Sequence, residues 1–579
     1  MRRFIVPAVL AFVILAMLAP PGFAQAPAPK VTITGLFDQI TSMGRNTYDG
    51  NLTRNSDKEW YARTRFRPDI EFAVGRVKAV LGLELDFQYG QSGPNDGGFP
   101  GNTSGSACGA GAGTLGGNAG ATPPGGKVNI SGCLDLNTDV AGLIEVKWIY
   151  TEFPLTGKDS LLPFIPVETM ARAGGQPFGT LAQYKLAQYA NGDFAGVSAI
   201  TTFAPNIKTN LAYAILEEEL AGSNRGNPSL KLSRGEDYAV IFSMDITPFK
   251  GLDLKPLYSL FHAGGQTAGG ARRNLTNRET AGGALNATAA RGTPTNPSAA
   301  GAPDYHEDRH TVGIDARWRL GPFSLDPTFY YQWGRVDSQA IDTGPGANGV
   351  GTKKVTADMS TFLFDVIGGF QLGPLLLEAR GMYSPGNKAR DNLAKGIRYY
   401  QPLDTDGTYY AGGWTQMFSA GVDYFNQGWA TTGNYVGYDR YGRAQLTGRA
   451  TYSITPALSL YGVLGPIWTA EKVDTDTGSQ LASAAGTGTQ ARTTVSQNSW
   501  AKGDTNYLGT EANLGLTWRF SPNTAFDLVG GWFFAHWGRS GFDAAECRGG
   551  AATTCAGGTV VKMEAQDAYT LAARIRLAF

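Results

Sequence analysis

The C-terminal segment, residues 568–579, limits the possible folds more than any other stretch, because its side chains alternate between two chemical kinds. Successive side chains of a β-strand point to opposite faces. One face of this segment carries Tyr569, Leu571, Ala573, Ile575, Leu577 and Phe579, and the other carries Thr570, Ala572, Arg574, Arg576 and Ala578. The arginine face requires water or counter-charges, and the apolar face requires a protein core or lipid. The segment therefore predicts a strand that separates an apolar from a polar environment.

The N-terminal residues 1–24 have the layout of a secretory signal peptide. Two arginines precede an apolar run from Phe4 to Ala19, and small residues occupy the positions before a cut after Ala24. We expect residues 25–579 to form the mature chain; the alternative, an N-terminal membrane anchor, is disfavoured because the run is shorter than the ~20 residues of a spanning helix. The cut removes two basic residues and no acidic one from a chain with 49 of each, so the net charge of the mature chain stays near zero. A nucleic-acid-binding protein would carry a surplus of basic residues, so this charge argues against nucleic-acid binding.

Long alternating segments and turns recur along the mature chain. In residues 61–74 the apolar set faces away from three arginines and two acids, which no protein core could hold together. Short turns rich in Pro or Gly connect pairs of such segments, and long polar or Gly-rich loops separate the pairs. We count eight short and nine long connections, which predicts eighteen strands, with sixteen as the alternative. The longest loops are expected at about 91–139, 264–306, 385–436, 472–505 and 539–564.

Aromatic residues recur near the predicted strand ends, as in interfacial girdles of membrane barrels. They are Trp148, Trp318, Tyr452, Trp518 and Phe520. The fold class predicted is all-β, namely a transmembrane, antiparallel, up-and-down β-barrel. The rival, a large soluble all-β protein, would have strands of roughly 5 to 6 residues, whereas these alternate over ten or more.

The polar strand faces would then line a water-filled pore. The predicted basic pore-lining residues are Arg63, Arg65, Arg67, Arg317, Arg319, Arg443, Arg449, Arg574 and Arg576. The predicted acidic ones are Asp69, Glu71, Glu84, Asp86, Asp315, Glu378 and Glu511. Closure of the last strand against the first brings the C-terminal arginines near those of 63–67, which predicts a basic stripe and a preference for anions. In the plainer alternative these arginines pair with nearby acids and merely keep the lumen polar.

The loop 385–436 mixes charges with aromatics, which makes it the best candidate for a segment that folds inward and narrows the pore. Its charged candidates are Lys388, Arg390, Asp391, Arg398, Asp404 and Asp406. The four cysteines form two local pairs, Cys108 with Cys133 and Cys547 with Cys555. In an exported chain we expect two disulfides, with free thiols as the alternative.

The run from His306 to His310 matches the letters of the zinc-protease motif H-E-x-x-H. That motif needs a helix, on which both histidines share a face. Here the run leads into a predicted strand, where a rise of ~3.3 Å per residue keeps the two rings apart. We therefore expect a polar strand entry at the barrel rim and no metal site, with adventitious metal binding together with Asp304 as the alternative. No cofactor and no catalytic activity are expected.

Taken together, the signal peptide, the alternating strands, the Pro/Gly turns, the long loops and the terminal Phe579 resemble a bacterial outer-membrane porin. In size and strand count the chain is similar to eighteen-stranded substrate-selective porins and alginate-export barrels. The resemblance implies passive diffusion of small hydrophilic solutes or ions across the outer membrane, contact with its lipid, and a homotrimer. The alternatives are an exporter of an acidic polysaccharide and a structural or docking barrel.

Overall fold

The structure, a computed structural model, describes about three fifths of the chain. The described residues are 28–46, 52–53, 58–89, 141–178, 189–190, 192–217, 237–265, 305–342, 351–388, 396–403, 414, 441–473, 505–535, 540–548 and 559–579. Every regular element within these ranges is a β-strand. In the same ranges there is no helix with the length and apolar character needed to cross a membrane.

Eighteen long strands form one sheet. They are β1 (Lys30–Arg45), β2 (Lys58–Val74), β3 (Val77–Tyr89), β4 (Ala141–Thr156), β5 (Glu168–Phe178), β6 (Gly192–Ala204), β7 (Ile207–Glu217), β8 (Asp237–Phe249), β9 (Leu252–Gly265), β10 (Tyr305–Leu320), β11 (Phe323–Asp342), β12 (Gly351–Leu372), β13 (Leu375–Ser384), β15 (Arg443–Ser453), β16 (Leu458–Val473), β17 (Thr505–Ser521), β18 (Thr524–Phe534) and β21 (Ala568–Ala578). Three short strands lie in the long connections, namely β14 (Gly396–Ile397), β19 (Ala544–Arg548) and β20 (Thr559–Met563).

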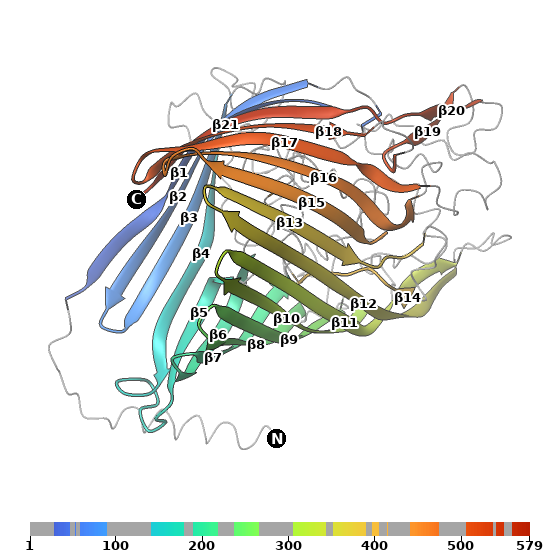
Figure 1. The fold of residues 1–579 in the computed structure, drawn as a ribbon. Coiled ribbons are helices and arrows are strands. Elements are labelled where there is room, and N and C mark those ends of the chain that lie inside the picture. The colour runs from blue at the N-terminus through green and yellow to red at the C-terminus, as the bar shows by residue number, and fades with distance from the viewer. Residues whose placement is uncertain are drawn as a thin grey trace, which may run out of the picture.

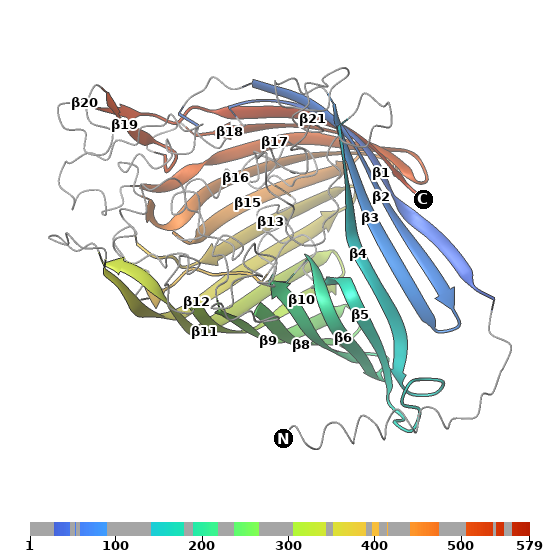
Figure 2. The same cartoon turned by 180° about the vertical axis from the view of Figure 1, so that it is seen from behind.

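The sheet closes on itself. Each long strand runs antiparallel to the next, and β21 pairs with β18 on one side and with β1 on the other. The closing ladder reaches from Leu36 opposite Ala578 to Arg45 opposite Tyr569. Figures 1 and 2 show the closed wall from opposite sides. Closure gives each of the eighteen long strands a neighbour on both sides, and the predicted eighteen-stranded up-and-down barrel is confirmed.

The two ends of the barrel differ in their connections. One end carries eight short links, most of them two residues long, and the other carries the nine long ones (Figure 1). Gly75, Gly321 and Gly373 open two-residue turns with φ of 59°, 57° and 56°. A positive φ at this position belongs to the primed turns, whose twist matches that of the flanking strands. Glycine at the turns is thus what keeps these hairpins tight.

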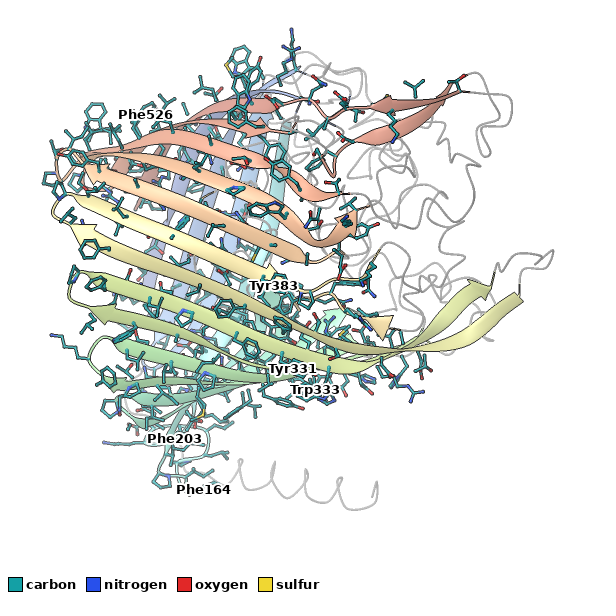
Figure 3. The ribbon with its side chains drawn as sticks, turned by 45° about the vertical axis from the view of Figure 1, so that its right-hand side comes forward. Phe164, Phe203, Tyr331, Trp333, Tyr383 and Phe526 are labelled. Atoms are coloured by element: carbon teal, nitrogen blue, oxygen red, sulfur yellow. The ribbon has the colours of Figure 1, made fainter. Side chains whose placement is uncertain are left out.

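The wall has an apolar outer face and a mostly polar or small inner face. On β21 the outward Leu571 and Ile575 are 45% and 46% exposed, whereas the inward Thr570 and Ala572 are 4% and 1% exposed. Aromatic side chains project outward at two levels in Figure 3. Phe164, Phe203 and Phe526 lie nearer the short connections, and Tyr331, Trp333 and Tyr383 lie nearer the long ones.

Trp148 does not belong to either aromatic level, and its predicted place in a girdle is wrong. A bulge shifts the β3–β4 register between Gly82 and Leu83, so that Lys147 and Trp148 both turn inward. The indole of Trp148 hydrogen-bonds the carboxylate of Asp69 inside the barrel. Its ring lies over Gly82, where a built Cβ would come within 1.9 Å of the indole nitrogen. The bulge, which strict alternation cannot predict, reverses the ring's direction.

Candidate functional site in the barrel lumen

Arginines from two strands face each other across β1. In the antiparallel register Asp38 lies between Arg65 of β2 and Arg576 of β21. Two residues further along β1, Ile40 lies between Arg63 of β2 and Arg574 of β21. Rows of this kind hold side chains about 5 Å apart across neighbouring strands. We call the following set the basic wall: Arg63, Arg65, Arg67, Lys147, Arg574 and Arg576, with the acids Asp38, Glu84 and Asp527.

Two carboxylates hold most of the basic wall in place. Glu84 accepts from Arg65 at 3.0 Å and from Arg67 at 2.7 Å, and the Lys147 ammonium lies 3.6 Å away. Asp527 of β18 pairs with Arg576 at 2.8 Å and with Arg574 at 3.3 Å. Each acid therefore bridges at least two cations. These contacts are of the kind expected in the plainer interpretation of the sequence, in which the arginines pair with nearby acids.

Two cations of the basic wall, Arg67 and Arg576, are nevertheless clearly more exposed than the acids they pair with. The side chain of Arg67 is 31% exposed against 12% for Glu84, and that of Arg576 is 36% exposed against 7% for Asp527. These two guanidinium groups are therefore more accessible to water than the carboxylates that hold them. A solute that approaches this wall meets arginine N–H donors first, and these form a planar fork suited to carboxylates.

The remaining predicted pore-lining residues also lie on inward strand faces, by the same alternation. Asp69 and Glu71 follow Arg67 on β2, and Arg317 and Arg319 lie on β10. Glu378 pairs with Arg449 at 3.7 Å. The buried ones are Asp315, Arg443 and Glu511. The side chain of Asp86 lies outside the described part of the structure. Their role in solute passage stays a prediction.

The opposite side of the lumen, on β6–β13, is packed rather than open. Buried inward side chains on β6–β9 are Phe194, Ala212, Ala214, Ala239, Ile241, Leu257, Phe261 and Ala263. Tyr189, Ala190 and Leu403, from two long connections, belong to the same buried cluster. We call this region, with the inward side chains of β10–β13, the packed wall.

Residues 396–403, here called the luminal segment, lie against the packed wall. The backbone of Gln401 exchanges two hydrogen bonds with the side chain of Gln332 on β11, at 2.7 and 3.0 Å. Tyr400 stacks on Tyr330 with 6.4 Å between ring centroids. The backbone N–H of Leu403 donates to the carbonyl of Tyr189 at 2.7 Å. These contacts hold the segment inside the barrel.

The start of the luminal segment continues the wall of the barrel. β14 pairs in parallel with β12 at Asp358 and Met359, beyond the point where β13 ends. Asn387 fixes this turn, because its side-chain amide donates to the carbonyl of Gly396 at 3.0 Å. Its side-chain oxygen accepts from the N–H of Arg398 at 2.9 Å. The chain thus leaves the wall at β14 and passes inward.

A second point of the same long connection also contacts the inner wall. Trp414 is buried with Ile367 of β12 and Val463 of β16. The Asn513 side chain donates to the Trp414 carbonyl at 3.1 Å and to Glu511 at 2.8 Å. Glu511, predicted from alternation alone, is therefore a buried acid next to an inserted ring.

Buried charged groups on the packed wall are held by hydrogen bonds to other buried side chains. Arg380 and Asp365 make two hydrogen bonds, at 3.0 and 2.6 Å, and their side chains are 1% and 0% exposed. Asp315 accepts from the hydroxyls of Thr328 at 2.5 Å and Tyr330 at 2.6 Å. Such groups face protein rather than a pore, so alternation placed Asp315 on the correct strand face without revealing that it is covered.

Some predictions fall outside the described residues. Of the six charged candidates in loop 385–436, Lys388 and Arg398 are described and exposed, whereas Arg390, Asp391, Asp404 and Asp406 are not described. Cys108, Cys133 and Cys555 are likewise outside, and only the backbone of Cys547 is described, in β19. Both disulfides stay predictions.

Sequence reasoning missed Asp38 and Asp527, the acids that complete the basic wall. Asp527 stands between apolar residues on β18, where alternation alone marks it as inward. Its two arginine partners are 47 and 49 residues further along the chain. The ion pairs of Asp527 with these arginines are identified only by the strand register of the closed barrel, in which β18 pairs with β21.

Comparisons with known proteins find remote structural similarity between this barrel and solved barrels. No family model matches, and no curated protein matches. Among solved structures, a BenF-like porin from Pseudomonas fluorescens Pf-5 aligns over 95% of this chain and 98% of its own, at 8% identity and a TM-score of 0.43. OccAB1 of Acinetobacter baumannii aligns over 95% and 97%, at 10% identity and 0.42. OpdK of Pseudomonas aeruginosa, solved with vanillate, aligns over 94% and 99%, at 9% identity and 0.40. Similarity at this level transfers no residue role and no solute to this chain.

Proposed function

We propose that the protein is a channel of the bacterial outer membrane through which small hydrophilic solutes or ions diffuse passively. One observation carries the proposal: a closed eighteen-stranded wall exposes large apolar side chains outward and holds ionisable ones inward. A closed barrel satisfies every strand hydrogen bond within the wall, as the hydrocarbon interior of a membrane requires. Barrels of sixteen to eighteen strands leave room for an aqueous channel.

The solutes favoured by this lumen are small anions, above all carboxylates. The support is the exposure of the basic wall, in which the guanidinium groups of Arg67 and Arg576 are about one-third exposed and their carboxylate partners are much less so. Donor groups fixed at the surface of a narrow, low-dielectric passage attract anions more strongly than the same groups in bulk water. Because Glu84 and Asp527 offset much of the charge, the preference is moderate rather than absolute.

The luminal segment narrows this channel. Its hydrogen bonds with Gln332 and its stacking on Tyr330 support a fixed obstacle along the packed wall. Solutes then pass between this obstacle and the basic wall, which brings them within reach of Arg67 and Arg576. An exporter of an acidic polysaccharide has less support, because acids interrupt the arginines.

Reversal potentials in planar lipid bilayers test the proposal. Under a salt gradient, wild-type channels are expected to select anions over cations. The double variant Arg67→Gln with Arg576→Gln removes the two most exposed cations of the basic wall, so we expect its reversal potential to move toward that of a cation-selective pore.

Arg335→Gln is the matched control. Arg335 is exposed on the opposite, outward face of β11, where it pairs with Asp337 at 3.1 Å. Its loss should leave the reversal potential unchanged. Absence of any conductance from the folded protein would contradict the channel, and cation selectivity of the wild type would contradict the anion preference alone.

A further inference from the structure

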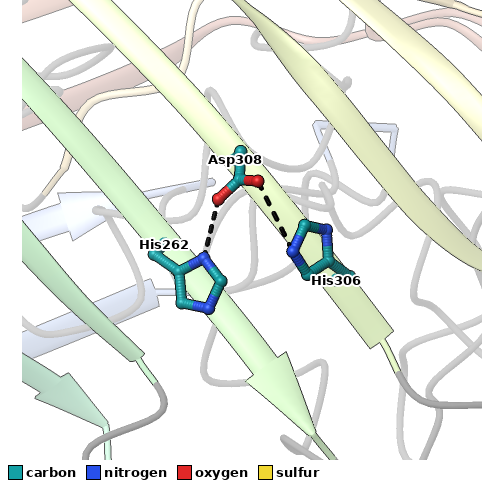
Figure 4. A group of neighbouring side chains, drawn as sticks. All are labelled: His262, His306 and Asp308. Atoms are coloured by element: carbon teal, nitrogen blue, oxygen red, sulfur yellow. Dashed lines mark hydrogen bonds and ion pairs between the residues drawn. The ribbon is translucent and has the colours of Figure 1, made fainter. Parts of the chain in front are cut away.

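Two histidines and an aspartate meet on the outer face of the barrel, away from the lumen (Figure 4). Among the described residues, His262, His306 and Asp308 form the one group of three ligand-type side chains whose ligand atoms all lie within 4.8 Å of one another. His262 comes from β9 and the other two from β10. The residues join through strand pairing, since His262 is the direct cross-strand partner of Asp308.

The cluster faces outward at the end of the barrel that carries the long connections. His306 and Asp308 alternate in phase with Val312 and Ile314, which are exposed on the outer face. Two residues further along, the ring of His310 stacks on Trp333 at 5.2 Å, within the outward aromatic level. The cluster therefore lies just beyond this aromatic level, where water reaches the side chains.

The carboxylate of Asp308 already joins the two rings. One oxygen is 2.7 Å from Nδ1 of His262, and the other is 3.4 Å from Nε2 of His306. The His262 ring is itself oriented by Tyr238, whose ring centroid lies 5.1 Å away. All three side chains are partly exposed, so an ion could enter from solution without opening the wall.

The spacing of these atoms suits a transition-metal ion. A tetrahedral site with metal–ligand distances of about 2.0–2.2 Å places its ligand atoms roughly 3.3–3.6 Å apart. In the cluster the Asp308 oxygens lie 2.7 and 3.4 Å from the two ring nitrogens and the three ligand atoms are all within 4.8 Å of one another, so small side-chain rotations would bring them to this spacing. Two imidazoles and one carboxylate favour zinc over calcium or magnesium, which prefer all-oxygen sites.

We propose that His262, His306 and Asp308 bind one Zn²⁺ ion on the outer rim of the barrel, with a fourth position open to water or to a ligand from the surroundings. The ion would tie β9 to β10 where the strands run into a long connection. The H-E-x-x-H run contributes its first histidine and Asp308 but not its second histidine, because Nδ1 of His310 is engaged with the hydroxyl of Tyr258 at 2.9 Å.

Zinc titration of the folded protein in detergent tests the site, with a chromophoric chelator as competitor. We expect one Zn²⁺ per wild-type chain. His306→Gln, and separately His262→Gln, should weaken that binding by at least about tenfold, because each removes one of three ligands. Cobalt substitution adds a spectroscopic readout, since tetrahedral Co²⁺ absorbs in the visible range and this absorption should vanish in both variants.

His310→Gln is the control, because it removes a nearby outward histidine that is not in the cluster. Circular dichroism should show an intact barrel for every variant. Zinc that binds the double variant His262→Gln with His306→Gln as tightly as the wild type would place the ion elsewhere and overturn the proposal. A wild-type protein that binds no zinc at micromolar concentration would reduce the cluster to a hydrogen-bonded His–Asp pair and equally overturn it. Neither result depends on whether the lumen conducts.

Discussion

The basic wall and the packed wall use charge in opposite ways. On the basic wall, Arg67 and Arg576 remain about one-third exposed over their acids. On the packed wall, Arg380 and Asp365 are sealed from solvent and bound to each other. An exposed ion pair contributes little to stability but presents charge to a passing solute. A sealed pair presents no charge, and its two members depend on each other.

This difference separates two tasks within one barrel. We infer that the packed wall, with the luminal segment against it, fixes the shape of the passage. The basic wall then provides the surface that solutes contact. Substitutions on the packed wall should therefore change stability and pore size, whereas those on the basic wall should change selectivity.

The largest effect is expected from breaking the sealed pair on the packed wall. Arg380→Met keeps much of the side-chain volume but leaves Asp365 without its bidentate partner. Removal of one member of a buried ion pair costs about 3–5 kcal/mol of unfolding free energy. Denaturant titration of the barrel in lipid vesicles measures this loss.

Arg576→Met provides the matched comparison on the basic wall. Its side chain is partly exposed and its acid keeps a second partner in Arg574, so the cost should be about 1 kcal/mol or less. Equal losses for the two variants would remove the distinction between the walls.

Excision of the long connection between β13 and β15 should open the pore. Gly386 and Gly442 approach closely, since a Cβ built on Gly386 would lie 2.3 Å from the backbone nitrogen of Gly442. A two-glycine link can therefore replace residues 387–441 without straining the strands. Because this removes the luminal segment and Trp414, we expect single-channel conductance to rise by about twofold or more, as for an unobstructed barrel of this size.

Circular dichroism must show that the shortened chain still folds. A point variant gives a second route to the same answer: Tyr400→Ala removes the ring that stacks on Tyr330 and should give a smaller rise in conductance. A folded excision variant with wild-type conductance would show that the connection does not obstruct the passage.

A smaller effect is expected from removing an acid beneath the basic wall. Asp527→Asn eliminates the carboxylate shared by Arg574 and Arg576, so the local positive charge increases. The anion-to-cation permeability ratio should rise, by about twofold or less because counter-ions screen charges in the lumen. Thr517, which donates to Asp527 at 2.7 Å, offers the control Thr517→Val, which leaves the charge unchanged. A shift toward cations in Asp527→Asn would contradict the predicted direction.

Local features of the sequence were enough to predict the barrel. Alternation with a period of two marks the inward and outward faces, and glycine turns such as Gly75 and Gly373 end hairpins at defined positions. These signals depend on neighbouring residues only, and they give eighteen strands and the closing contact of β21 with β1.

The contents of the lumen depend on contacts that local patterns do not contain. Trp148 turned inward because one bulge altered the phase of β4. Tyr400 reached Tyr330, and His262 reached His306, only through the three-dimensional path of long connections and strand pairing. The sequence therefore identified the charged inner faces but not which of them would be covered.

Cysteine labelling at two neighbouring positions of β21 tests most directly whether water fills the barrel and lipid surrounds it. In a background whose four cysteines are replaced by serine, Arg576→Cys and Ile575→Cys are compared in lipid vesicles with a charged, water-soluble thiol reagent. Because thiolates react only where water and the reagent reach them, residue 576 should react at least about a hundredfold faster than residue 575, and its modification should lower conductance. Equal reactivity at the two positions, or faster reaction at 575, would contradict the account.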